Sequence, residues 1–101
     1  MSFMLVITSL PNRDDHREIE AWANFRGYAD MDNLQKVKGV FCFNESAWLF
    51  DTRKALAPLG VFIYHANRLS IQLHSLQLDD ETIRCRLASP ASAKLEEFLS
   101  S

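Results

Sequence analysis

The stretch RLSIQLHSLQLDDETIRCRLA, at residues 68–88, decides the fold class. Apolar residues alternate with polar ones on both sides of the acidic break LDDET at residues 78–82. Such alternation is typical of strands with one buried and one solvated face, and two alternating runs around a polar break indicate a β-hairpin. The hairpin predicts a globular domain with an antiparallel sheet.

The remaining sequence predicts further strands and helices around this hairpin. An apolar run over 3–9 is typical of a central strand that is buried on both faces. A polar stretch with acidic residues at its start predicts a helix over 12–26, which Gly27 would end. The other expected elements are strands over 39–43 and 61–65 and a final helix that begins at Ser89 and Pro90.

Residues 44–57 fit two interpretations. As a helix, the segment has a cap at Asn44, an acidic first turn and basic residues near its end, which is the charge order that the helix dipole favours. As a strand, Ala47–Asp51 would pair back on the preceding strand, and Phe50, which the helix leaves on its polar side, would be better placed. We prefer the helix and keep the strand as the alternative.

Together these elements predict one α+β domain over residues 1–101, with a mainly antiparallel sheet of four to five strands and helices packed on it. A ferredoxin-like arrangement is the first expectation and a thioredoxin-like one the second. The second has a local basis, because Pro58 followed by residues 61–65, the hairpin and AKLEEFL at 93–99 resemble the C-terminal half of a thioredoxin domain. This resemblance covers less than half of the chain. The Cys-x-x-Cys motif of thioredoxins is missing, so the resemblance implies no redox function.

Composition and charge narrow the function classes. The formal net charge is −2 and the isoelectric point about 5.8, whereas a dedicated nucleic-acid binder usually carries a basic excess.

Cys42 and Cys85 lack the spacing of a zinc or redox motif, so we expect two buried thiols, with a disulfide between them as the alternative. Residues 1–8 are apolar but too short for a membrane span, and they lack the features of a signal peptide. We therefore expect a cytoplasmic protein with no membrane partner.

No motif of catalysis or cofactor binding stands out. The densest ionisable cluster, DDHRE at residues 14–18, could bind a metal or move protons, but it fits better as the solvated first turn of a helix. The three glycines form no phosphate-binding loop, and no serine lies in a Gly-x-Ser-x-Gly elbow. Small ferredoxin-like nucleases, such as the CRISPR adaptation nucleases, typically place an aspartate at the end of the first strand, where this chain has Ile7-Thr8-Ser9-Leu10. We predict no catalytic residue, no metal site and no cofactor.

These exclusions, together with the aromatic residues that crowd between positions 41 and 64, favour a small non-enzymatic domain that binds another protein as an inhibitor, adaptor or accessory protein. It would act through a sheet edge or an aromatic patch, and we expect it to form a homodimer. The residues expected to bind the partner are Trp48, Phe50 and Tyr64 as apolar anchors and Arg84 and Arg86 as polar contacts.

The alternative is a nucleic-acid-associated regulator or small nuclease that uses a basic sheet face. Arg84 and Arg86 alternate onto the polar face of the expected hairpin together with His74, and Lys36 and Lys38 would extend the patch. Such a surface predicts salt-dependent binding to a phosphate backbone.

A third hypothesis is a small-molecule enzyme that uses His16, His65 or His74 as its acid–base group. It would need a pocket that buries one of these histidines beside a carboxylate, because such surroundings tune a side chain for proton transfer.

Overall fold

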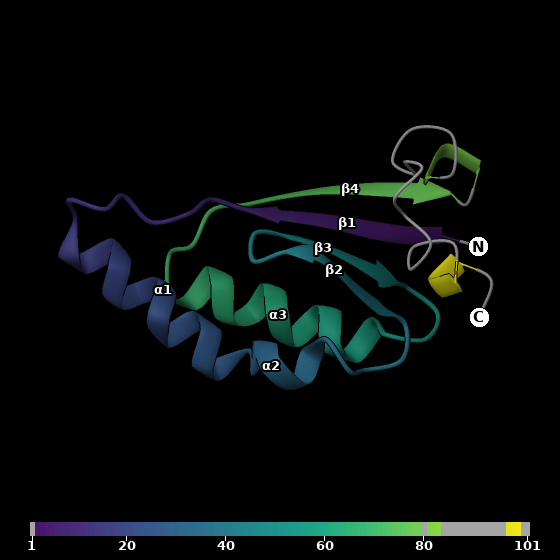
Figure 1. Cartoon of the computed structure of the whole chain (residues 1–101), viewed down its shortest axis with the longest axis horizontal. Coiled ribbons are helices and arrows are strands. Elements are labelled where there is room, and N and C mark those ends of the chain that lie inside the picture. Colours follow the sequence, from purple (N-terminus) through teal and green to yellow (C-terminus); the bar gives the residue numbers. More distant parts are fainter. Residues whose placement is uncertain (1, 80, 84–96, 100–101) are drawn as a thin grey trace.

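The computed structural model describes residues 2–79, 81–83 and 97–99 (Figure 1). Along the chain the elements are β1 (Ser2–Thr8), α1 (His16–Tyr28), α2 (Met31–Leu34), β2 (Val40–Asn44), β3 (Ala47–Asp51), α3 (Leu56–Arg68) and β4 (Leu73–Asp79). The strands form one antiparallel sheet in the order β2-β3-β1-β4. The predicted α+β class with a mainly antiparallel sheet is confirmed.

β1 takes an inner position in the sheet because it is apolar on both faces. Val6 lies opposite Trp48 of β3 on one side and Ser75 of β4 on the other. Phe3 and Val6 point to opposite faces of the sheet, and they are 1% and 0% exposed. The predicted buried strand over 3–9 is therefore confirmed, with its bounds shifted by one residue.

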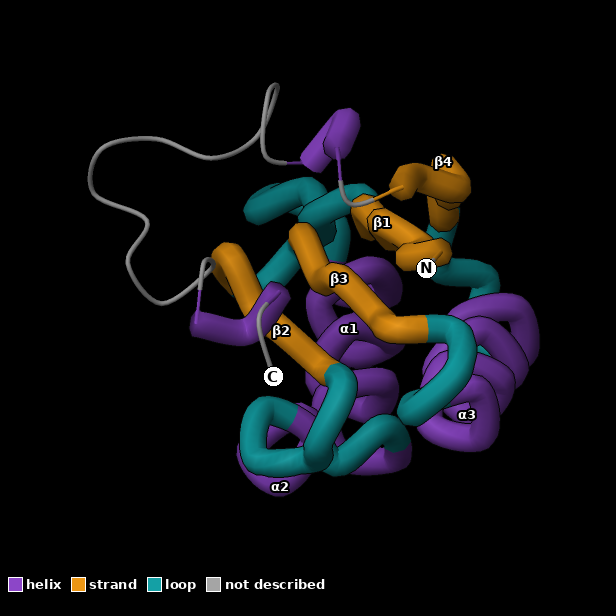
Figure 2. The backbone as a smooth tube through the Cα atoms, turned by 90° about the vertical axis from the view of Figure 1, so that its right-hand side faces the viewer, coloured by secondary structure: helices purple, strands orange, loops and turns teal. Residues whose placement is uncertain are grey.

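α1, α2 and α3 cover one face of the sheet (Figure 2). Phe62 of α3 lies at the centre of this interface, where its ring is 5.0 Å from Phe25 of α1, 5.5 Å from Phe50 and 5.8 Å from Trp48. All four side chains are at most 1% exposed. Burying one large apolar side chain contributes roughly 1.5–3 kcal/mol to the free energy of folding. These four buried rings therefore form the main core of the domain.

The opposite side, which we call the open face of the sheet, is only partly covered. Phe3 and Leu49 pack there against Ile83 and Leu99, which belong to the described parts of the C-terminal region. Beyond this cluster, apolar side chains remain exposed to solvent, namely Ile7 by 43%, Phe43 by 38% and Leu76 by 58%.

The preferred helix over residues 44–57 is wrong, and the alternative strand over Ala47–Asp51 is confirmed. Leu49 and Phe50 are both 0% exposed although consecutive residues of a strand point to opposite faces, so β3 is buried on both sides. Asn44 serves the β2–β3 turn instead of capping a helix. Its side-chain oxygen accepts hydrogen bonds from the backbone N–H and the hydroxyl of Ser46.

The predicted strand over 61–65 is also wrong, because these residues form the middle of α3. Leu59, Phe62 and Ala66 are buried along one side of the helix, at the spacing that faces a core. Pro58 is the third helical residue, where an N–H would have no partner inside the helix. No helix within the described ranges is long and apolar enough to cross a membrane.

The alternating run around residue 73 does form a strand, β4, and it pairs with β1. Residues 81–83 are helical. The side chain of Asp79 accepts a hydrogen bond of 2.7 Å from the backbone N–H of Thr82, and this bond lowers the pKa of the Asp79 carboxyl. The rest of the predicted second strand lies outside the described residues.

The helix predicted over 12–26 is confirmed as α1, with its bounds at His16 and Tyr28. The side chain of Asp15 accepts hydrogen bonds from the backbone N–H groups of Arg17 and Glu18, which is the geometry of an N-cap. Gly27 lies inside the last turn and does not end the helix. Of the predicted C-terminal helix, the structure describes only residues 97–99, which are helical.

Candidate functional site

Two of the three predicted apolar anchors are core residues. Trp48 and Phe50 are 1% and 0% exposed, and both face Phe62 of α3. The indole N–H of Trp48 donates to the backbone carbonyl of Glu45 at 3.2 Å, so its one polar group is satisfied inside the protein. A partner cannot contact Trp48 or Phe50 while the chain has this fold, so their burial contradicts the prediction that they are anchors.

Tyr64, the third predicted anchor, is 62% exposed on the surface of α3. It belongs to a group of side chains that we call the aromatic cluster, which consists of Tyr28, Tyr64, His65 and Arg68. α1 supplies Tyr28 as its last residue, and α3 supplies the other three. Tyr28 is also largely exposed, at 56%.

Ring contacts order this cluster. The rings of Tyr28 and His65 stack, with 5.5 Å between centroids and 17° between planes, and the ring of Tyr64 meets His65 edge-on at 5.1 Å. The guanidinium carbon of Arg68 lies 4.4 Å from the centroid of Tyr28, and its Nη2 lies 3.4 Å from Nδ1 of His65. Because the exposed groups already support each other, a partner would immobilise fewer free rotamers on binding.

The chemistry of the cluster is that of an interface anchor. Tyrosine and arginine are enriched among the residues that contribute most to protein–protein binding. Arg68 forms no ion pair with any residue that the structure describes. α3 itself carries no acidic residue, so the positive charge of Arg68 is available to an acidic group on a partner.

Of the aromatic cluster, the sequence predicts only Tyr64 as an anchor. The strand predicted over 61–65 separates His65 from Arg68, whereas in a helix their three-residue spacing brings them together. Tyr28 had no signal of its own, because its contact with Arg68 joins two helices that are distant in sequence.

The free edge of β4 is the second exposed feature. β4 pairs with β1, and within the described residues no strand pairs with its other side. The N–H of Ser9 donates to the carbonyl of Gln72 at 3.0 Å, and alternate residues of an antiparallel strand face the same neighbour. The even-numbered residues of β4 therefore bond to β1. The N–H and C=O groups that point to the free edge belong to Leu73, Ser75, Gln77 and Asp79.

β4 is also accessible on both of its faces. Leu76, which lies opposite Leu5 on the open face, is 58% exposed, and Ser75 and Gln77 on the helix side are exposed as well. Natural edge strands usually carry a lysine, a proline or a bulge that blocks further pairing. β4 has none of these, whereas β2, at the other edge, has an irregular register between Cys42 and Asn44.

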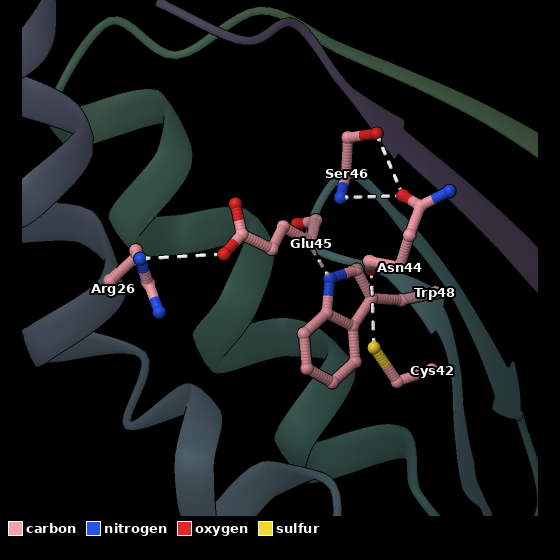
Figure 3. A network of polar contacts seen from close by, with 6 residues as sticks. All are labelled: Arg26, Cys42, Asn44, Glu45, Ser46 and Trp48. Atoms are coloured by element: carbon pink, nitrogen blue, oxygen red, sulfur yellow. Dashed lines mark hydrogen bonds and ion pairs between the residues drawn. The ribbon is translucent and has the colours of Figure 1, made fainter.

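A network of polar contacts closes the β2–β3 turn beside α1 (Figure 3). Arg26 of α1 forms an ion pair of 3.5 Å with Glu45, and the carbonyl of Glu45 accepts the indole N–H of Trp48. The thiol of Cys42 donates to the carbonyl of Asn44 at 3.1 Å. A cavity of about 230 Å³ lies next to this network and is lined in part by Arg26, Cys42 and Glu45.

The Cys42 thiol lacks the surroundings of a nucleophile. Burial raises its pKa, and the carboxylate of Glu45 raises it further. Reactive cysteines instead have a lowered pKa beside cationic groups or a helix N-terminus. Within the described residues Cys42 is a free thiol, and Cys85 lies outside them.

The histidine-based enzyme hypothesis requires a pocket that buries a histidine beside a carboxylate. His65 contacts Tyr28, Tyr64 and Arg68, and no carboxylate is among its neighbours in the described part of the chain. The cavities beside α1, α2 and α3 have no histidine among their described lining residues. In residues 2–79, 81–83 and 97–99 no group of three or more histidine, cysteine or acidic residues could hold a metal ion.

Of the residues proposed for nucleic-acid binding, the structure places His74 apart from Lys36 and Lys38. His74 lies opposite Ile7, near one end of the sheet. Lys36 and Lys38 lie in the loop before Val40, which is level with the opposite end of β1. Arg84 and Arg86 lie outside the described residues.

No protein-family model matches the sequence, and no curated protein matches it. The candidate binding features are therefore the aromatic cluster and the free edge of β4.

Proposed function

We propose that this chain is a non-enzymatic protein-binding domain that recruits another polypeptide by strand addition at the free edge of β4. The observation that carries the proposal is the row of outward N–H and C=O groups on Leu73, Ser75, Gln77 and Asp79. An extended segment that pairs there would satisfy these groups with main-chain hydrogen bonds, which supply affinity in strand addition. The exposed Leu76 beside them offers an apolar contact that supplies specificity.

The same proposal includes a ferredoxin-like arrangement of the domain. Its support is the order of elements, β-α-β-β-α-β, with α2 counted as a short extension of α1. In this arrangement the last strand lies at an edge of the sheet, as β4 does here.

The aromatic cluster supports binding through a second contact. Tyr64 and Arg68 are exposed on the helix side, where an acidic group of the partner would pair with the guanidinium and an apolar group would pack on the tyrosine ring. We assign this cluster a supporting role, since side chains alone contact the partner there, whereas the edge also offers main-chain groups that pair with no described strand.

The experiment that tests strand addition is a peptide-display selection against the folded protein, followed by titration of the selected peptides into Ser75→Pro and Ser75→Ala variants. Proline at 75 removes an outward N–H but no bond to β1, so the variant keeps its fold. We expect Ser75→Pro to weaken binding at least tenfold, about 1.4 kcal/mol, and Ser75→Ala to leave it unchanged. Peptides that bind both variants equally would contradict the proposal.

The nucleic-acid alternative stays a prediction that concerns Arg84 and Arg86. It requires salt-dependent binding to single-stranded or duplex nucleic acid that is lost when both arginines are replaced by alanine. Under the proposal above, the protein shows little affinity for either at physiological salt, and a filter-binding assay separates the two.

A further inference from the structure

We propose that the strand which pairs with the free edge of β4 is β4 of a second copy of this chain, related by a two-fold axis that passes beside Leu76. This inference rests on the proposed function, because it names the occupant of the same edge. The two sheets would continue into one antiparallel sheet, and the helices of both copies would cover the same side of it.

The direction of the backbone groups decides the possible registers. Residues whose N–H and C=O point outward must face each other in hydrogen-bonded pairs. An axis beside Leu76 places Ser75 opposite Gln77 of the second copy and Leu73 opposite Asp79 of the second copy. Every outward N–H and C=O of β4 then has a partner, and the overlap uses the whole strand, Leu73–Asp79.

The side chains fit the same register. Leu76 would meet its own copy in a non-hydrogen-bonded pair, where the two Cα atoms are about 4.5 Å apart and the side chains pack closely. This contact would cover the most exposed apolar residue of β4, at 58%. His74 would lie opposite Leu78 on the same face, and the one charged residue of the strand, Asp79, would lie opposite Leu73 and not opposite itself.

Other two-fold registers are worse. An axis at Ser75 leaves Asp79 without a partner in β4, and an axis at Gln77 leaves Leu73 without one. Each of these shortens the ladder and moves Leu76 away from its own copy. A strand whose sequence is most complementary to itself when fully overlapped favours a second copy over an unrelated segment.

Room for the second copy exists on both sides of the edge. Ser75 and Gln77 are exposed on the helix side, so no helix among the described residues of the same copy fills the space beside them. Figure 2 shows β4 at the end of the sheet, with α1, α2 and α3 below it. A strand can therefore approach in the plane of the sheet without displacing a described element.

The test is cysteine cross-linking in a chain that carries Cys42→Ser and Cys85→Ser. Leu76→Cys should form a disulfide-linked dimer under mild oxidation, since cross-strand Cβ atoms of such a pair lie near disulfide distance. Ser75→Cys and Gln77→Cys, as matched controls, should not link to themselves. A mixture of His74→Cys and Leu78→Cys chains should link only to each other. Light scattering of the unmodified protein should give the mass of a dimer, and Ser75→Pro should weaken the dimer at least tenfold.

Amide hydrogen exchange separates the possible failures. A monomer whose Ser75 and Gln77 amides exchange freely overturns the second copy as the occupant and leaves strand addition by another polypeptide intact. A monomer in which these amides are protected means that the chain covers its own edge, which overturns both proposals. A dimer that links through position 75 or 77 overturns the register, and a dimer that links through none of the five positions overturns the edge.

Discussion

The guanidinium carbon of Arg68 lies 4.4 Å from the centre of the Tyr28 ring, so the last turn of α3 contacts the last residue of α1. A cation–π contact at an exposed site contributes about 0.5–1 kcal/mol. We predict that a double-mutant cycle of Tyr28→Ala and Arg68→Ala shows a coupling energy of this size in urea unfolding. A cycle of Tyr28→Ala with Arg53→Ala, which precedes α3, should show none. Equal coupling in both cycles would mean that the contact is not specific.

Phe62 should be the most sensitive single position of the helix–sheet interface. It is 1% exposed, and its ring contacts Phe25, Trp48 and Phe50. We expect Phe62→Ala to lower the free energy of unfolding by about 3–5 kcal/mol, because removing a buried aromatic ring leaves a cavity. The control is Val61→Ala, one residue earlier and 50% exposed, which should cost less than about 0.5 kcal/mol. Similar losses for the two variants, measured by urea unfolding, would contradict the described core.

Replacing Gly39 and Gly60 by alanine should change the stability of the fold in opposite directions. Gly39 has φ +90°, and a Cβ there would lie 2.8 Å from Cβ of Lys54, so Gly39→Ala should destabilise the fold by about 1–3 kcal/mol. Gly60 is helical and a Cβ there would meet nothing within 4 Å, so Gly60→Ala should stabilise it by about 0.5–1 kcal/mol. Thermal unfolding of the two variants should shift the midpoint in opposite directions. Shifts of the same sign would contradict the backbone conformation at Gly39.

The parts of the fold that sequence predicts correctly are those with one consistent signal. β1 is apolar over its whole length, and α1 begins at an acidic cap. The sequence predicts a strand in place of α3 because Val61, Ile63 and Tyr64 are typical strand residues. A short apolar run does not distinguish a strand from a buried helix. Tertiary burial of Phe62 and Ala66 on one side decides in favour of the helix.

The candidate site was harder to predict than the fold. The abundance of aromatic residues predicts Trp48, Phe50 and Tyr64 as anchors for a partner. Only the packing of α3 on β3 shows that Trp48 and Phe50 are interior. For β4, alternation predicted a strand, but the pairing with β1 depends on the register of residues about seventy positions apart. That pairing determines which backbone groups of β4 do not bond to β1, and no local sequence pattern reveals the pairing.

The thiol of Cys42 gives a test of the non-enzymatic proposal by pH. Burial raises its pKa first and Glu45 second, and only the thiolate reacts with alkylating reagents. In a Cys85→Ser chain, we expect the alkylation rate of Cys42 to rise at a higher pH than in the urea-unfolded chain. Glu45→Gln should shift this rise toward lower pH, because it removes the nearby negative charge, whereas Glu18→Gln at the start of α1 should not.

The raised pKa of Cys42 also makes the stability of the fold depend on pH. The folded state holds the Cys42 proton more tightly than the unfolded chain, so its contribution to stability is complete below the unfolded pKa and is lost as the pH rises through the folded pKa. Urea unfolding of Cys85→Ser should therefore show a loss of stability at alkaline pH that Cys42→Ser removes. If Cys42 instead reacts at a lower pH than the unfolded chain, it is an activated thiol, and the cavity beside Arg26 and Glu45 becomes a candidate catalytic site.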